Sequence, residues 1–166
     1  MNQVIDTSTI PKDMPVQSPV NSKFQFSHFV VPTDFSPNSE KAIDYAVQLA
    51  RRLGAKLTLL HVVPEPSALD YSIDGVSLKE IEGWEAEAEK RLAQELARAQ
   101  AAYANVESMQ VTALHPRDEI VSAATDLSAD LLVISTHGYT GWKHFLFGSD
   151  AEKIVEQAPC PVVVVR

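Results

Sequence analysis

The chain has 166 residues, 45% of them hydrophobic, and a formal net charge of −8. This length favours one domain around one core, and the acidic charge argues against a nucleic-acid partner, because phosphate backbones are bound through clustered Lys and Arg. A single cysteine excludes an internal disulfide framework, and no stretch approaches the ~18 consecutive apolar residues of a membrane span.

The first part of the chain differs from the rest in composition and in hydrophobic periodicity. Residues 1–26 carry scattered prolines and polar residues without sustained hydrophobic periodicity, which predicts a flexible N-terminal tail. The same residues lack the basic and apolar regions of a secretory signal, so the expected compartment is the cytoplasm. The folded domain is expected over residues 27–166.

The first strand and helix are marked by local signals. "HFVVPTD" at 28–34 predicts a strand, and apolar residues at helical spacing follow it. Ser36 as N-cap, Pro37 at the first helical position and Gly54 just past the end bracket the predicted helix. "KLTLLHVV" at 56–63 predicts the second strand, and His61 within it is expected to be a hydrogen-bonded imidazole of the core.

The same alternation continues to the last residue. Further helices are predicted at about 78–104, 117–129 and 149–158, and further strands at 106–112, 130–135 and 161–166. Five strands alternating with four helices predict an α/β fold: a three-layer doubly wound sandwich whose parallel sheet carries helices on both faces. Ligands of such sheets bind outside the carboxyl ends of the strands, where the strand order reverses.

The loop "STHGYTGWKHFLFGS" at 135–149 combines three glycines with the start of the last helix. Unpaired N–H groups and positive partial charge at a helix start suit a phosphate. Ser149 and Glu152 also form a capping box, which explains the helix start without a ligand but leaves Gly138 and Gly141 unexplained. The residues alone leave both interpretations open. They match neither the dinucleotide fingerprint nor the P-loop motif.

The segments "VVPTDFSPNSEKAIDYAVQLARRLGAKLTLLHVV" and "ADLLVISTHGYTGWKHFLFGSDAEKIVEQAPCPVVVVR" carry a family resemblance. Over about residues 27–166 the chain resembles the universal stress protein family. Nucleotide-binding members carry G-x2-G-x9-G-[ST], and this spacing falls on Gly138 and Gly148-Ser149, with Ser135 in place of the first glycine. The resemblance also implies the strand order 3-2-1-4-5.

The resemblance implies where ATP, or AMP, would bind. Pro32, Thr33 and Asp34 end the first strand, the Asp34 carboxylate suits ribose or adenine donors, and Val62 flanks the base. Asp150 opposes a polyphosphate and Lys143 offers one nearby cation, so Mg²⁺ is expected to accompany the nucleotide. The implied phosphate cradle comprises Ser135, His137, Gly138, Tyr139, Thr140, Gly141, Gly148 and Ser149.

The leading functional hypothesis is an ATP-binding stress-response regulatory protein whose nucleotide occupancy alters the surfaces offered to an unidentified regulatory partner. No base for an attacking water can be identified, so ATP hydrolysis is expected to be very slow or absent. The alternative is a universal stress protein that binds no nucleotide and acts only through dimerisation and protein contacts, which Ser135 and Asp150 favour. A phospho-acceptor receiver domain would need an acidic pair after the first strand, where Thr33-Asp34 stands.

The last strand predicts an oligomer. "PVVVVR" at 161–166 contains four consecutive valines, which suit a strand buried on both faces. In the order 3-2-1-4-5 this strand is an edge, and a long apolar edge invites pairing with another copy. The expected assembly is a homodimer through strand 161–166.

Overall fold

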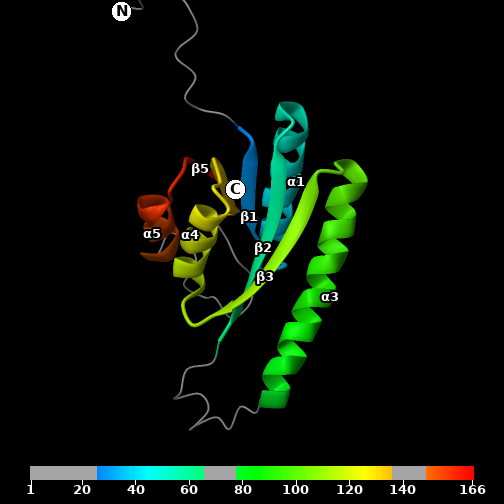
Figure 1. Ribbon diagram of the computed structural model, residues 1–166, viewed down its shortest axis with the longest axis vertical. Coiled ribbons are helices and arrows are strands. Elements are labelled where there is room, and N and C mark those ends of the chain that lie inside the picture. The colour runs from blue at the N-terminus through cyan, green and yellow to red at the C-terminus, as the bar shows by residue number, and fades with distance from the viewer. Residues whose placement is uncertain (1–25, 66–77, 136–148) are drawn as a thin grey trace, which may run out of the picture.

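The structure is a computed structural model that describes residues 26–65, 78–135 and 149–166. They form a five-stranded parallel sheet in the order β3-β2-β1-β4-β5, as predicted (Figure 1). The elements in chain order are β1 (His28–Pro32), α1 (Pro37–Leu53), β2 (Lys56–Pro64), α3 (Leu78–Ala102), β3 (Val106–Ala113), α4 (Pro116–Asp126), β4 (Leu131–Ser135), α5 (Ser149–Gln157) and β5 (Val162–Val165).

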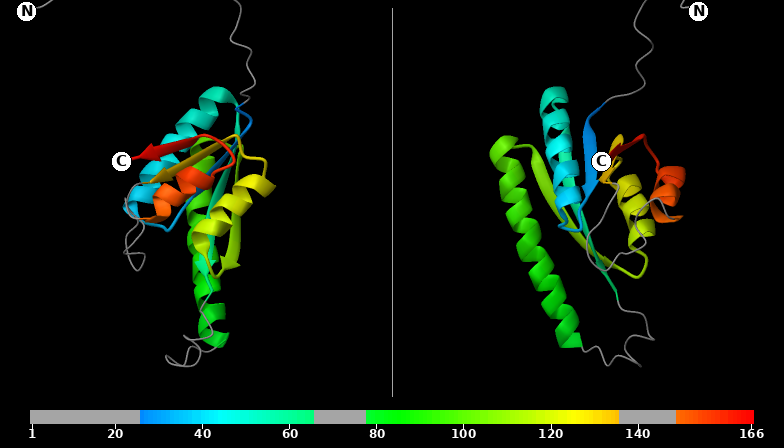
Figure 2. Two further views of the ribbon diagram at one scale, coloured as in Figure 1. Left: turned by 90° about the vertical axis from the view of Figure 1, so that its left-hand side faces the viewer. Right: turned by 180° about the vertical axis from the view of Figure 1, so that it is seen from behind.

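Helices cover both faces of the sheet, which confirms the predicted three-layer architecture. α1 and α3 lie on one face, and α4 and α5 lie on the other (Figures 1 and 2). Each face has its own apolar core because successive strand residues point to opposite sides. Phe29 and Val31 belong to the α1 side, whereas Val30 belongs to the α4 side, and all three are fully buried.

The predicted signals at both ends of α1 are confirmed. The Ser36 hydroxyl accepts a hydrogen bond from the backbone N–H of Ser39 at 3.2 Å, which satisfies one of the free donors of the first turn. Gly54 ends the helix in the left-handed conformation, with φ 73°, and its N–H donates to Ala50 O. Both ends are thus fixed by residues of the same segment.

Several element boundaries differ by one to three residues from the sequence prediction, and for the end of α4 and the start of β4 the structure shows the cause. α4 ends at Asp126 instead of residue 129, because Ser128 has a φ of 51° and so leaves the right-handed helix. Asp130 precedes β4 instead of belonging to it. Its Oδ2 accepts from the backbone N–H of Ser27 at 2.6 Å and from the hydroxyl of Ser27 at 2.7 Å, so it ties the start of the domain to the sheet. Residues 1–25 of the predicted tail lie outside the described residues.

The valines of β5 are less buried than their run predicts. β5 pairs with β4 on one side only, and its residues are half-buried apart from Val164, which is 42% exposed. The prediction of a strand buried on both faces is therefore wrong for the single chain, because an edge strand receives less cover than a central one. Its outer edge carries N–H and C=O groups that no described strand pairs.

Candidate functional site

The strand order reverses at β1, which pairs with β2 on one side and β4 on the other. The chain proceeds from β1 through β2 to β3 in one direction, and β4 and β5 lie in the other. Thr33 and Asp34 directly follow β1 at this point, and the Thr33 N–H donates to Leu60 O of β2 at 2.8 Å. The structure therefore places these predicted residues at the position where doubly wound sheets bind ligands.

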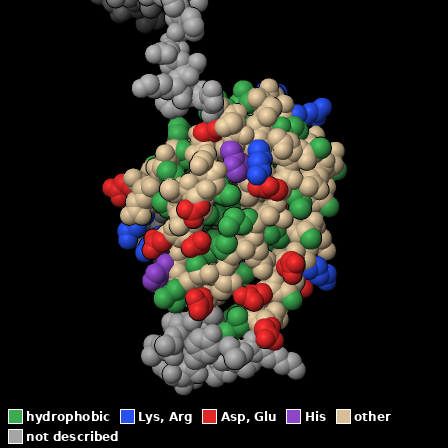
Figure 3. Space-filling view, in the orientation of Figure 1, with side chains coloured by type: hydrophobic (Ala, Val, Ile, Leu, Met, Phe, Trp, Pro, Cys, Tyr) green, Lys and Arg blue, Asp and Glu red, His purple; other side chains and the backbone are tan. Residues whose placement is uncertain are grey.

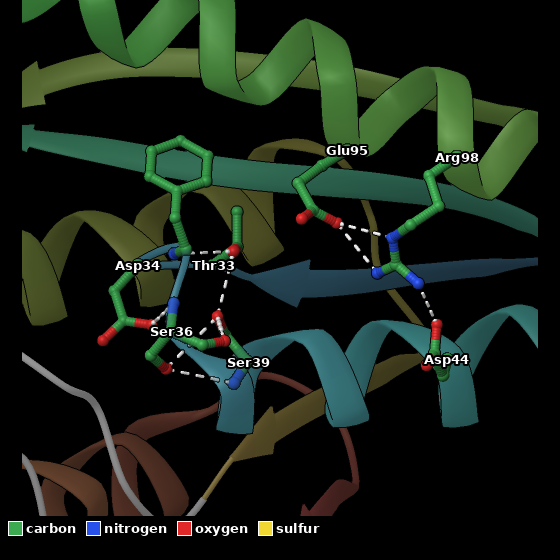
Figure 4. A network of polar contacts seen from close by, with 8 residues as sticks. Thr33, Asp34, Ser36, Ser39, Asp44, Glu95 and Arg98 are labelled. Carbon is green, nitrogen blue, oxygen red and sulfur yellow. Dashed lines mark hydrogen bonds and ion pairs between the residues drawn. The ribbon is translucent and has the colours of Figure 1, made fainter.

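A tight turn after β1 fixes the Asp34 carboxylate (Figure 4). Asp34 Oδ1 accepts from the Ser36 N–H at 3.0 Å, and Thr33 Oγ1 accepts from the Phe35 N–H at 3.1 Å. Thr33 Oγ1 also donates to Ser39 Oγ at 3.2 Å, which links the turn to the buried start of α1. No hydrogen bond from a described residue reaches Asp34 Oδ2, so one carboxylate oxygen holds the turn while the other is not used by it.

Phe35 occupies a strained position in this turn. Its φ of 61° lies in the left-handed region, which costs a non-glycine residue roughly 1–2 kcal/mol. The Phe35 ring stacks on the His61 ring at 4.3 Å between centroids and a 35° tilt, and the Arg91 guanidinium carbon lies 4.7 Å from its centroid. Aromatic and cation–π contacts of this kind offset such a cost. Phe35, His61 and Arg91 are called the Phe35 cluster below.

His61 joins the Phe35 cluster to the backbone of the turn. Its Nδ1 lies 2.8 Å from Thr33 O, and because a carbonyl only accepts, Nδ1 carries a proton and donates. Burial lowers the pKa of His61 below its ordinary value of 6.5, although the Thr33 hydrogen bond and the charge of Asp34 act in the opposite direction. The half-buried ring is therefore neutral at pH 7 and hydrogen-bonded as predicted.

The neutral His61 ring makes stability depend on pH. The unfolded chain takes up a proton near pH 6.5 more readily than the folded chain, so the free energy of unfolding is expected to fall as pH falls below 6.5 towards the lowered folded pKa. His61→Gln removes the titrating ring and keeps a side-chain N–H for Thr33 O. Urea denaturation at about pH 7.5 and about pH 5.5 should show a smaller acid loss in this variant. An equal loss in both proteins would contradict the assignment.

Farther along α3 than Arg91, a separate polar contact joins α3 to α1 (Figure 4). Arg98 of α3 pairs with Asp44 of α1, and its second terminal nitrogen lies 2.8 Å from Glu95 Oε2. The side chains of Arg98 and Asp44 are 42% and 56% exposed, so the ion pair between them adds little to stability. It contacts none of the four residues of the turn, 33–36, which makes Arg98 a useful reference for Arg91.

Residues 25–166 match the model of the Universal stress protein family. The chain belongs to this family. It is 32% identical over 159 residues to universal stress protein YxiE of Bacillus subtilis, covering 85% of this chain and 99% of that protein. A universal stress protein of Methanocaldococcus jannaschii is 31% identical over 153 residues, covering 88% of this chain and 85% of that one.

Solved universal stress proteins share the fold. The structure of UspA from Lactobacillus plantarum matches with a TM-score of 0.72 and 26% identity, covering 86% of this chain and 99% of that chain. A universal stress protein crystallised in complex with cAMP matches with a TM-score of 0.65 and 29% identity, covering 86% and 98%. Some of the structural neighbours therefore bind a nucleotide.

The other predicted site residues of this universal stress protein fall into two groups. Pro32 and Ser135 end β1 and β4 and are half-buried, and Val62 near the end of β2 is 5% exposed in the core on the α4 side. Ser149 is the first residue of α5, but its side chain is not described. The remaining predicted residues lie outside the described residues: His137, Gly138, Tyr139, Thr140, Gly141 and Gly148.

Sequence reasoning missed two members of the Phe35 cluster. Phe35 follows Asp34 directly, yet nothing in its neighbourhood indicates a left-handed backbone, which glycine and asparagine usually occupy. Arg91 lies on α3, and only the packing of that helix brings it to the turn. His61 was expected to be hydrogen-bonded, but its partner, the carbonyl of Thr33, was not predicted.

Two further features bear on ligands and partners. Within residues 26–65, 78–135 and 149–166, no group of three or more His, Cys, Asp and Glu side chains could hold a metal ion, and no helix is long and apolar enough to cross a membrane. On the face seen in Figure 3, acidic side chains are spread over the surface and Lys and Arg side chains stand apart from one another. That face offers no basic patch of the kind that binds nucleic acid.

Proposed function

We propose that this universal stress protein is a regulatory protein that binds ATP, or AMP, with Mg²⁺ accompanying the nucleotide, and that occupancy changes the surfaces offered to a protein partner. The observation that carries this proposal is the Asp34 carboxylate at the reversal of strand order, with Oδ1 fixed by the Ser36 N–H. A fixed carboxylate that has a second oxygen to offer suits the paired hydroxyl donors of a ribose.

If the ribose binds Asp34, the fold also suggests where the base and the phosphates of the nucleotide would lie. The base would lie towards Val62, near the end of the neighbouring strand, where an apolar side chain suits a ring. The phosphates would lie towards the start of α5, whose first-turn N–H groups and helix dipole favour negative charge. The cAMP complex of a universal stress protein 29% identical to this chain supports an adenine nucleotide as the ligand class.

Isothermal titration calorimetry of the purified chain with ATP and Mg²⁺ tests the proposal. We expect saturable heat with one nucleotide bound per chain, because each chain has one reversal of strand order. The second candidate function is a universal stress protein that acts only through dimerisation and protein contacts. It is favoured by Ser135, which stands where the nucleotide-binding motif has its first glycine, and it predicts no heat with ATP or AMP.

We further propose that two copies pair through β5 to form a homodimer. β5 is an edge strand with an exposed apolar residue, Val164, and such an edge is stabilised by pairing with a second copy. Val164→Lys places a charge on that edge and is expected to shift the protein to monomer in light scattering. Val155→Lys puts the same charge on an exposed position of α5 and should leave the dimer intact. A wild-type monomer would contradict the proposal.

A further inference from the structure

We propose that Phe35 is a positioning residue for the nucleotide: its ring, in contact with His61 of β2 and Arg91 of α3, holds the left-handed turn that orients the Asp34 carboxylate. The inference rests on the proposed function and deepens it. It makes α3 part of the frame of the site, although no residue of α3 was expected near the ligand.

The backbone of Phe35 determines where the Asp34 carboxylate lies. The Phe35 N–H donates to Thr33 Oγ1 and the next N–H, of Ser36, donates to Asp34 Oδ1. Both bonds are formed with Phe35 at a φ of 61°. Rotation of Phe35 to a right-handed or extended φ would swing the Ser36 N–H away from Asp34. The carboxylate would then lose the bond that selects its side-chain rotamer.

The ring contacts hold that backbone from outside the turn. An alanine at this position would bear the same steric conflict between Cβ and backbone without gaining any contact. Phe35 gains the stacking with His61 at 4.3 Å and the contact with Arg91 at 4.7 Å. His61 is itself held by its bond to Thr33 O at 2.8 Å. His61 thus contacts two residues of the same turn, Thr33 through a hydrogen bond and Phe35 through its ring, and so holds the turn at both places.

The experiment compares dissociation constants of ATP and of adenosine, with Mg²⁺ present, for the wild-type chain and five variants, one of which is a control. Phe35→Ala removes the ring and keeps the steric conflict, and is expected to raise both dissociation constants by about tenfold. Phe35→Gly also removes the ring but accepts the left-handed backbone freely, so it should lose less affinity than Phe35→Ala. Phe35→Tyr retains the ring and should bind as the wild type does.

The fourth variant tests the contribution of α3. Arg91→Ala should weaken binding of both ligands, although less than Phe35→Ala, because it removes one of the two ring contacts. Arg98→Ala serves as its matched control, since it removes an exposed arginine of the same helix that contacts Asp44 and Glu95 instead of the turn. It should leave both dissociation constants unchanged.

The pattern across ligands separates positioning from other roles. Because the proposal places Asp34 at the sugar, Phe35→Ala should raise the dissociation constants of adenosine and of ATP by the same factor. A change in the phosphate site would raise the dissociation constant of ATP alone. Equal losses in Phe35→Ala and Phe35→Gly would instead indicate that the ring touches the ligand, and would overturn the proposal. A Phe35→Ala variant that binds both ligands as tightly as a binding-competent wild type would also overturn the proposal. A wild type that binds neither ligand would overturn the proposed function and this inference together.

Discussion

Asp34→Asn is expected to weaken ATP binding by roughly 10- to 100-fold, the effect of losing a hydrogen bond to a charged acceptor. Asparagine keeps an Oδ1 that can accept from the Ser36 N–H, so the turn is retained. It replaces Oδ2 by an amide that donates instead of accepting, and it removes the charge. The ribose hydroxyls would then meet a donor where the proposal gives them an acceptor. Calorimetry with ATP and Mg²⁺ measures the change.

Asp44→Asn provides the control for this substitution. Asp44 lies on α1, exposed and paired with Arg98, so its replacement removes the same charge without touching the turn. Its dissociation constant for ATP should match that of the wild type. If both variants weakened binding equally, the effect would be one of overall charge, and Asp34 would have no specific role at the ribose.

Phe29→Ala is expected to lower the free energy of unfolding by about 3–5 kcal/mol. Phe29 is fully buried in β1, and its register partners are Leu57 of β2 and Leu131 of β4. Removing the ring at the centre of the sheet loses its burial and leaves a cavity that the neighbouring strands cannot close. Because the free energy of unfolding of a small domain is only about 5–15 kcal/mol, this loss would bring the chain close to unfolding. Urea denaturation followed by circular dichroism gives the value.

Tyr45→Ala is the matched control for Phe29→Ala. Tyr45 is an aromatic residue of α1 that is 45% exposed, so its truncation creates no closed cavity. We expect its effect to stay within about 0.5 kcal/mol, as for most surface substitutions. A Phe29→Ala variant as stable as Tyr45→Ala would show that the core on the α1 side is not packed as described.

Much of the fold could be predicted because its signals are local. Ser36, Pro37 and Gly54 bracket α1 through bonds within a few residues of each helix end, and the structure confirms all three. The alternation of apolar runs with helical periodicity gave the parallel sheet, since each parallel connection needs a crossover. The order 3-2-1-4-5 came from the family resemblance, because no local pattern states which strands are neighbours. The structure shows the same order.

Only part of the candidate site could be predicted. The structure brings Thr33 and Asp34 to the reversal of strand order, whereas the glycine loop that was expected to hold the phosphates lies outside the described residues and stays a prediction. The end of α4 and the start of β4 were misplaced, because Ser128 has a left-handed backbone and the Asp130 side chain bonds to Ser27. Neither feature can be seen in hydrophobic spacing.

The sequence by itself determined the fold class, the bounds of α1 and the position of Asp34 after a buried strand, because caps and periodicity act between near neighbours along the chain. The tertiary structure alone decided how that carboxylate is held. Thr33 and His61 are 28 positions apart in the chain, and Phe35 meets Arg91 only because α3 packs across the sheet. Contacts between such distant residues depend on how the layers pack, which no short stretch of sequence encodes.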